Sequence, residues 1–180
     1  MIKYNCIMSV DPSINYCGWC AYVKADSQWR IAGKGLIKPN KELGDDEYIK
    51  SKDVYKQVAS GIKICEGKFG KVLLVLETPA HWAIGGFEAR ESGNMGKLHF
   101  LCGMLYTLSD TFLVYPANWK GQYPKPVVRN RMIRIFKEEN SGIVDADKLA
   151  IELEKINHNT MDAIGIGYWY LYKREKGKVI

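Results

Sequence analysis

The chain has 180 residues, a formal net charge of +6 and 47% hydrophobic residues. These values are typical of one soluble globular domain, here residues 1–180, which can form a core without disulfides or a structural metal. No apolar run approaches the ~20 residues of a membrane span, and the N-terminus lacks the basic and apolar regions of a signal peptide. We therefore expect a cytoplasmic protein that does not contact a membrane.

The first half of the chain predicts three strands, a helix and a further strand. An apolar run ends at Asp11, and the turn residues 12–15 separate it from a segment of alternating polarity. Apolar residues at helical spacing follow, and then a short, continuous apolar run that is typical of a strand covered on both faces. The predicted ranges are 5–10, 18–23 and 29–37 for a β-meander, 45–67 for the helix and 71–76 for the buried strand.

The second half predicts a long loop after Glu77, followed mainly by helices. The helix expected over 93–109 has an apolar face wide enough for both the core and a partner subunit. A short strand over 112–115 and helices over 126–139, 145–156 and 160–173 complete the pattern. We therefore predict an α/β fold with a five-stranded mixed sheet, in which an antiparallel three-stranded meander joins parallel strands and helices flank both.

The five cysteines are odd in number and lie mostly in apolar runs, which favours reduced, buried thiols. Cys17 and Cys20 have a spacing found in zinc and redox motifs. However, the histidines are too scattered to complete a zinc site, and the segment alternates like a strand instead of opening a helix. Two packed strand thiols are therefore the favoured interpretation.

Positive charge is concentrated between Val114 and Lys137, where no acidic residue occurs. Trp119 and Tyr123 lie among these basic residues, and basic side chains interleaved with aromatic ones suit a phosphate backbone and unstacked bases. A solvated helix face that binds nothing explains the same charges equally well. The basic residues are Lys120, Lys125, Arg129, Arg131, Arg134 and Lys137.

Three acidic residues stand at the ends of otherwise apolar elements, namely Asp11, Glu77 and Asp162. Burying an unpaired carboxylate is costly, so carboxylates beside a core usually have a role. Hard oxygen ligands without a Cys or His cluster favour Mg²⁺ or Mn²⁺ over zinc. Each residue also has a purely structural interpretation, as a turn former at Asp11, a loop start at Glu77 and a helix cap at Asp162.

Four segments, in order over nearly the whole chain, resemble motifs of the RuvC-like Holliday junction resolvases, most closely the phage-type members. SVDPSINYCGWCAYV at 9–23 is similar to the first strand and turn of that family, and VLLVLETP at 72–79 is similar to its buried strand ending in a catalytic Glu. YPANWKG at 115–121 resembles the segment that leads to a basic catalytic residue. HNTMDAIGIGYWYL at 158–171 resembles the terminal Asp-Ala helix.

This resemblance implies a ribonuclease H-like fold, a homodimer and Mg²⁺-dependent nicking of two opposed strands at a four-way DNA junction. Whether other branched DNA is also cut stays open at this point. The resemblance further implies two Mg²⁺ ions per site, which Mn²⁺ can replace, and no small-molecule cofactor. Asp11, Glu77 and Asp162 match the metal-binding carboxylates, and Lys120 would lie against the scissile phosphate. An Asp or a His usually stands three residues before the last Asp; here that position holds Asn159.

Two residues therefore compete for the fourth position of the site. Asn159 is favoured by position and His158 by chemistry, because an imidazole can bind a metal or move a proton. Both could share a helix face with Asp162. A surface role for His158 is equally open.

The loop at 81–90 is expected beside the active site. Trp82 or Phe87 would stack on or wedge between bases and Arg90 would take a phosphate, although an ordinary loop with aromatics folded onto the core is the alternative. Lys97 joins the basic segment as a further expected DNA contact. Other candidate functions are a ribonuclease H, a flap or branch nuclease, and an inactive protein that binds branched DNA.

Overall fold

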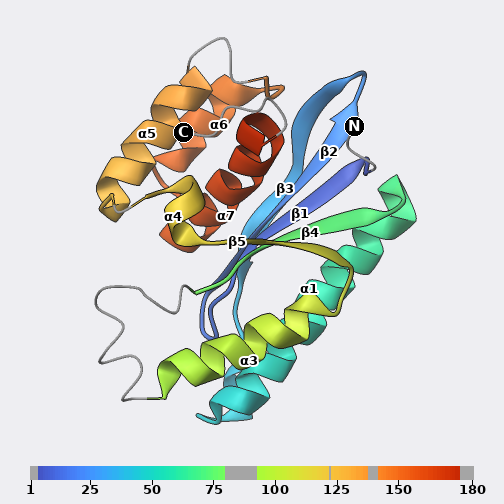
Figure 1. Ribbon diagram of the computed structural model, residues 1–180, viewed down its shortest axis with the longest axis vertical. Helices are drawn as coiled ribbons and strands as arrows, with labels where there is room; N and C mark the ends of the chain where they lie inside the picture. Colours follow the sequence, from blue (N-terminus) through green and yellow to red (C-terminus); the bar gives the residue numbers. More distant parts are fainter. Residues whose placement is uncertain (1–3, 80–92, 122, 138–141, 175–180) are drawn as a thin grey trace.

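The computed structural model describes residues 4–79, 93–121, 123–137 and 142–174 (Figure 1). A five-stranded sheet has the order β3-β2-β1-β4-β5. β1 (Cys6–Asp11), β2 (Cys17–Ala25) and β3 (Gln28–Ile37) form an antiparallel meander, and β4 (Val72–Glu77) and β5 (Asp110–Val114) extend it in parallel from β1. The predicted mixed sheet is confirmed.

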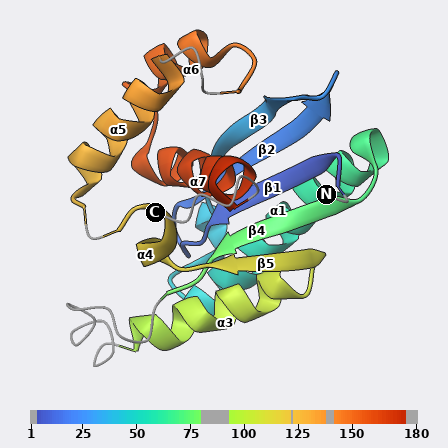
Figure 2. The ribbon, with the colours of Figure 1, turned by 45° about the horizontal axis from the view of Figure 1, so that its top comes forward.

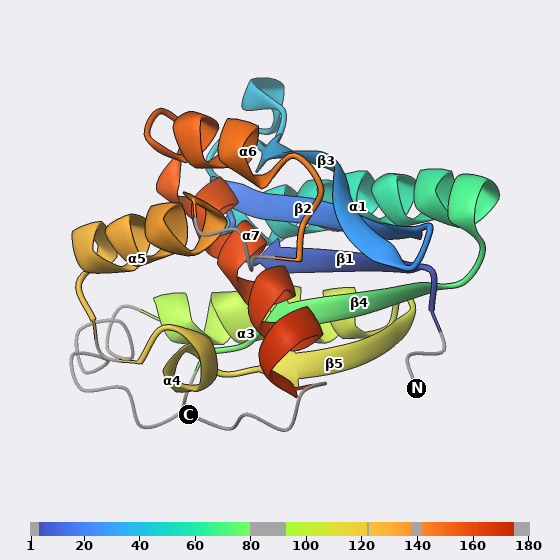
Figure 3. The same ribbon diagram turned by 90° about the horizontal axis from the view of Figure 1, so that it is seen from above.

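Helices cover both faces of this sheet (Figures 2 and 3). On one face lie α1 (Glu47–Phe69) and α3 (Asn94–Tyr106), and on the other lie α5 (Lys125–Lys137), α6 (Ala146–Leu153) and α7 (His158–Trp169). Leu73 and Val75 of β4 belong to the core beneath α7, whereas Leu74 and Leu76 belong to the core beneath α1 and α3. Burial on both faces explains why β4 is apolar at every position before Glu77.

Three short elements complete the described chain: the 3₁₀ turn η1 (Lys41–Leu43), the helix α4 (Pro116–Trp119) and the π-helical turn η2 (Tyr170–Arg174). The helix α4 was not predicted from the sequence. Its Pro116 occupies a first-turn position that proline favours. The last helix begins at His158, because the Asn157 side chain accepts the Asn159 N–H at 2.8 Å and caps it. Asp162 therefore lies inside the helix, and its interpretation as a helix cap is wrong.

The cysteines in the structure are free and buried. Cys17 and Cys20 lie on β2, as the packed-thiol interpretation predicts. Burial raises the pKa of Cys17 to about 12, so its thiol stays protonated at neutral pH. Within the described residues, no helix combines the length and apolar character needed to cross a bilayer.

Glycines allow α7 to lie directly on the sheet. A Cβ atom at Gly167 would come within 2.3 Å of the Tyr22 ring and 2.7 Å of Ser9 Oγ. A Cβ atom at Gly18 of β2 would lie 2.0 Å from the Asn159 carbonyl oxygen. Side chains of the sheet then reach the helix backbone: the Ser9 hydroxyl donates to Ala163 O and the Tyr22 hydroxyl to Ile164 O, each at 2.7 Å.

Replacing Gly167 by Ala should therefore destabilise the protein. Overpacking of this kind costs about 1–3 kcal/mol, which corresponds to a fall of roughly 2–10 °C in the thermal unfolding midpoint. Gly67 of α1 is the matched control, because nothing lies within 4 Å of a Cβ there. Gly67→Ala should leave the midpoint unchanged or raise it. Equal midpoints for Gly167→Ala and the wild type would contradict the close packing.

Candidate active site

The first two carboxylates of the site come from neighbouring parallel strands. β1 and β4 pair in register up to Val10 and Leu76, and the next residues along the two strands are Asp11 and Glu77. Because parallel strands end at the same edge of a sheet, their two carboxyl groups meet there. Glu77 is buried although its side chain is ionisable, with only 9% of its surface exposed.

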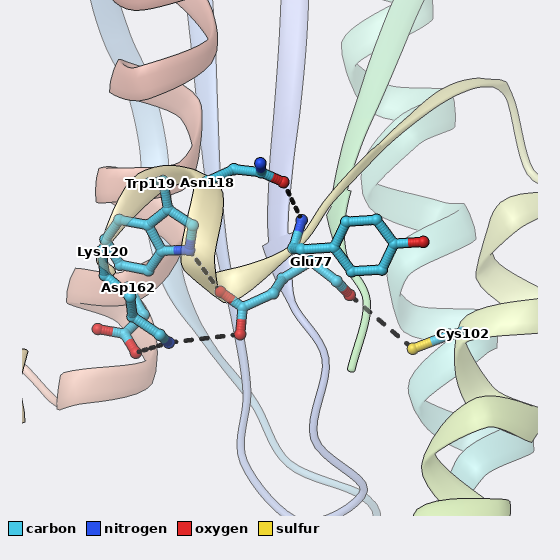
Figure 4. Close-up of polar contacts among 7 residues, drawn as sticks. Glu77, Cys102, Asn118, Trp119, Lys120 and Asp162 are labelled. Carbon is cyan, nitrogen blue, oxygen red and sulfur yellow. Dashed lines mark hydrogen bonds and ion pairs between the residues drawn. The ribbon is translucent and has the colours of Figure 1, made fainter. Parts of the chain in front are cut away.

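Asp162 and Lys120 join this edge from two other elements. Asp162 is 4% exposed and points from α7, while Lys120 directly follows α4. The Lys120 ammonium lies 3.3 Å from Glu77 Oε1 and 3.1 Å from Asp162 Oδ2 (Figure 4). The Lys120 ammonium thus bridges Glu77 and Asp162, which are 85 residues apart in the sequence.

Trp119 orients Glu77. Its indole Nε1–H donates to Glu77 Oε2 at 2.5 Å, and its ring packs against Gly165 of α7, where a Cβ would come within 2.4 Å. Trp119 is buried, so the prediction that it belongs to a surface for unstacked bases is wrong. Its hydrogen bond could not be foreseen because α4 itself was not predicted.

The surroundings disfavour charge on the carboxyl groups of Asp11 and Glu77. Burial raises the pKa of Asp11 well above its ordinary value, and the carboxylates of Glu77 and Asp162 raise it further, against the opposing effect of Lys120. Burial also raises the pKa of Glu77, although Lys120 and the Trp119 hydrogen bond partly offset this effect. Burial lowers the pKa of Lys120, but the attraction of the carboxylates outweighs it, so the net shift is upward. Additional positive charge would stabilise this cluster.

A pocket of about 490 Å³ opens beside the cluster. It brings together all of the predicted catalytic residues except Glu77. The lining residues are Asp11, Ser13, Tyr16, Lys120, Lys125, Asn157, His158, Asn159 and Asp162.

Three residues of this pocket were not predicted from the sequence, namely Ser13, Tyr16 and Asn157. The turn that follows Asp11 was a usable signal for Ser13 and Tyr16, because residues directly after a strand-end carboxylate border the same site. Asn157 is found through its position before the first turn of a helix, which is a preferred position for Asn.

His158 and Asn159 both line the pocket, as required of a fourth ligand. The Asn159 side-chain amide donates to the Tyr16 carbonyl oxygen, which joins the start of α7 to the turn between β1 and β2. The amide oxygen of Asn159 is the only atom of that side-chain amide with the chemistry of a metal ligand. The choice between these two residues stays a prediction.

The donor set fits a hard divalent cation. The carboxyl groups are oxygen donors of the kind that Mg²⁺ and Mn²⁺ prefer, and they gather negative charge in a low-dielectric environment. In the structure the Lys120 ammonium lies between Glu77 and Asp162 and supplies positive charge to these two carboxylates. In this arrangement, no three Asp, Glu, His or Cys side chains of the described chain approach closely enough to bind one ion.

The expected DNA contacts separate into distinct places. The Arg129 guanidinium donates to the carbonyl oxygens of Leu153, Glu154 and Ile156 at 3.0–3.1 Å, so it ties α5 to the end of α6. Lys97 pairs with Glu47 of α1. Arg131 and Arg134 line a pocket of about 650 Å³ between α4 and α5, together with Tyr123. Trp82, Phe87 and Arg90 lie outside the described residues.

No protein-family model matches this sequence, and no curated protein matches it significantly. Solved structures do match. Thermus thermophilus RuvC in complex with a Holliday junction substrate has a TM-score of 0.58 at 11% identity, with 97% of each chain covered. Fowlpox virus resolvase with Holliday junction DNA has a TM-score of 0.50 at 15% identity, over 92% of this chain and 97% of that one.

This chain has a RuvC-like fold. The yeast mitochondrial Holliday junction resolvase is also similar, with a TM-score of 0.50 at 12% identity over 97% of this chain and 84% of that one. The predicted ribonuclease H-like architecture is therefore confirmed. In this RuvC-like fold, the carboxylates lie where two central parallel strands end.

In the metal-free protein, Asp11→Asn should raise the thermal unfolding midpoint at neutral pH, because the amide buries no charge beside Glu77. A carboxyl group with a raised folded pKa contributes its full stability below its unfolded pKa of about 4, and this contribution is lost as the pH rises through the folded pKa. The advantage of the variant should therefore be absent near pH 4 and reach a few degrees by pH 8. Calorimetry in EDTA measures it.

Ser13→Ala is the matched control, because Ser13 lines the same pocket without a charge. Its midpoint should differ from that of the wild type by the same amount at every pH. An advantage of Asp11→Asn that shrinks as the pH rises would contradict the charge cluster.

Proposed function

We propose that this protein is a divalent-metal-dependent endonuclease that resolves four-way DNA junctions, and other branched DNA, by symmetric nicking as a homodimer. The observation that carries the proposal is the cluster of Asp11, Glu77 and Asp162 around Lys120, at the edge of a RuvC-like sheet. A pocket beside the cluster leaves room for a phosphodiester group.

Asp11, Glu77 and Asp162, with Asn159 or His158, would hold two Mg²⁺ or Mn²⁺ ions. Bound divalent ions supply an activated water and stabilise the departing 3′-oxygen in phosphodiester hydrolysis. Asp11 would hold the ions together with Glu77 of the neighbouring strand β4 and Asp162 of α7, the helix that packs on β1 and β2. Trp119 keeps the Glu77 carboxylate in one orientation.

Lys120 would act on the phosphate. In the structure its ammonium is held by Glu77 and Asp162. An ammonium released from these carboxylates would face the non-bridging oxygens and offset the charge that develops in the transition state. Lys125, on the wall of the same pocket, would bind the neighbouring phosphate.

Basic side chains of α5 would carry one arm of the junction. Arg131 and Arg134 border the pocket beside α4 together with the exposed ring of Tyr123, which suits a phosphate backbone and a stacked base. Arg129 is committed to the α6 backbone and would stabilise this surface without binding DNA.

Two cuts require two active sites, and the described residues of one chain contain one such cluster of carboxylates. A two-fold dimer would match the near two-fold symmetry of an open junction. We place its interface on α3, where Phe100 is 38% exposed and packs edge-on against the exposed ring of Tyr48 of α1 at 5.2 Å. Apolar and aromatic surface of this kind is typical of subunit contacts.

Asp11→Asn and Glu77→Gln should each slow nicking of a synthetic four-way junction by at least about 100-fold in Mg²⁺, because each removes a ligand without removing volume. Binding of the junction should be retained, since losing negative charge does not repel phosphates. Gel assays of nicking and of binding measure the two effects separately, and EDTA should abolish nicking by the wild type.

Asp147→Asn is the control, an exposed carboxylate on α6 whose removal should leave nicking unchanged. If Asp11→Asn or Glu77→Gln nicked the junction as fast as the wild type, this result would contradict the assignment of that carboxylate to the active site. Faster cleavage of an RNA–DNA hybrid or a flap than of the junction would instead show that the substrate is wrong.

Arg131→Ala combined with Arg134→Ala should weaken junction binding and reduce its salt dependence, by about one unit of slope for each phosphate that is no longer bound. Arg129→Ala should instead lower the unfolding midpoint, because three backbone carbonyl groups lose their donor. Titrations at several salt concentrations, with melting curves, separate the two roles. A double variant that binds with an unchanged salt slope would exclude α5 from the interface.

A further inference from the structure

Tyr16 presents an aromatic side chain at the mouth of the candidate active site. It lies in the turn between β1 and β2, five residues after Asp11, and half of its surface (50%) is exposed. Tyr16 lines the same pocket as Asp11, His158 and Asp162. The exposed ring lies beside the carboxylates of the candidate site, where it can contact a ligand that enters the pocket.

The backbone of Tyr16 is fixed on both sides. Its N–H donates to Ser13 Oγ at 3.3 Å, and its carbonyl oxygen accepts from the side-chain amide of Asn159. The next residues belong to β2, where Gly18 packs against the backbone of Asn159. The ring therefore stands on a rigid support, and a ligand that packs on it would lose little entropy in ordering it.

A lysine accompanies this ring. Lys38 Nζ lies 5.5 Å from the centroid of the Tyr16 ring, a cation–π distance, and Lys38 is itself exposed. The Lys38 carbonyl oxygen accepts from Gln57 Nε2 of α1 at 3.0 Å, which anchors this residue beyond the end of β3. An aromatic face with an adjacent ammonium is the combination that binds a nucleotide of single-stranded nucleic acid, by stacking on its base and pairing with its phosphate.

We infer that Tyr16 and Lys38 form the binding site for an unpaired nucleotide next to the scissile phosphate, with the base stacked on Tyr16 and its phosphate on Lys38. This inference rests on the proposed nuclease function and names how the cleaved strand is held. Stacking needs the ring and not the hydroxyl group. The site would therefore favour substrates whose strands separate at the cut, which a junction provides and a continuous duplex does not.

Photocrosslinking tests the contact directly. Once the nicks in a four-way junction are mapped, thymines placed at each flanking position are replaced one at a time by 5-iodouracil, which crosslinks to stacked aromatic rings. With the Asp11→Asn protein, which binds without cutting, we expect one flanking position to crosslink to Tyr16, identified by mass spectrometry of the peptides. Adding Tyr16→Leu should remove this crosslink, and adding Ile151→Ala, a change of an exposed apolar residue on α6, should leave it.

Kinetics give an independent readout. In the otherwise wild-type protein, Tyr16→Leu should lower kcat/KM for junction nicking by roughly 5- to 100-fold, the effect of losing one base–aromatic stack, while Tyr16→Phe should retain it. Unchanged unfolding midpoints show that both variants fold. The inference would be overturned if Tyr16→Leu crosslinked and nicked the junction as well as the protein with Tyr16 does. An equal loss of nicking in Tyr16→Phe and Tyr16→Leu would also overturn it.

Failure of the inference and failure of the proposed function give different results. If only the nucleotide site is wrong, the wild type still nicks the junction in Mg²⁺ and Tyr16→Leu does so equally well. If the proposed function is wrong, the wild type does not nick the junction, and no crosslink from it is expected at all.

Discussion

The site depends on how closely α7 approaches the sheet. Gly18 and Gly167 leave no room for a side-chain atom between the helix and β2, and Ser9 and Tyr22 donate hydrogen bonds to its backbone. A helix held at this distance brings Asp162 to the ends of β1 and β4. The same contact orders the turn after Asp11, because Gly18 packs on the backbone of Asn159. Close packing of the helix thus holds the three carboxylates near one another, against their mutual repulsion.

Repulsion among these carboxylates is the chemical property on which the proposed function depends. Burial and mutual repulsion raise the pKa of Asp11, and in the structure Lys120 supplies the nearest compensating charge. Such a cluster favours any arrangement that adds positive charge. Because the carboxylates repel a negatively charged phosphodiester, we expect the phosphodiester to bind only together with cations. We expect the roles to divide accordingly, with the carboxylates binding metal, Lys120 the scissile phosphate, and α5 the more distant backbone.

The sequence predicted the parts of the site that a periodic pattern reveals. Asp11 and Glu77 follow apolar strand residues, so their place at strand ends could be predicted, and the order of strands and helices followed from periods of two and 3.6. Contacts between distant segments were not legible. Arg129 looked like a DNA contact because its partners, at the end of α6, are backbone carbonyls without a sequence signature. Trp119 looked like a surface aromatic because its hydrogen-bond partner is 42 residues away.

The central claim is that Asp11, Glu77 and Asp162 bind divalent cations at one edge of the sheet. Crystals soaked in Mn²⁺ test it most directly, through the anomalous signal of the metal. We predict anomalous density in contact with Asp11 and Asp162, a Lys120 ammonium that has left the two carboxylates, and no such density in Asp11→Asn crystals. The claim would be contradicted if, at saturating Mn²⁺, Lys120 still bridged Glu77 and Asp162 and metal bound only at other places.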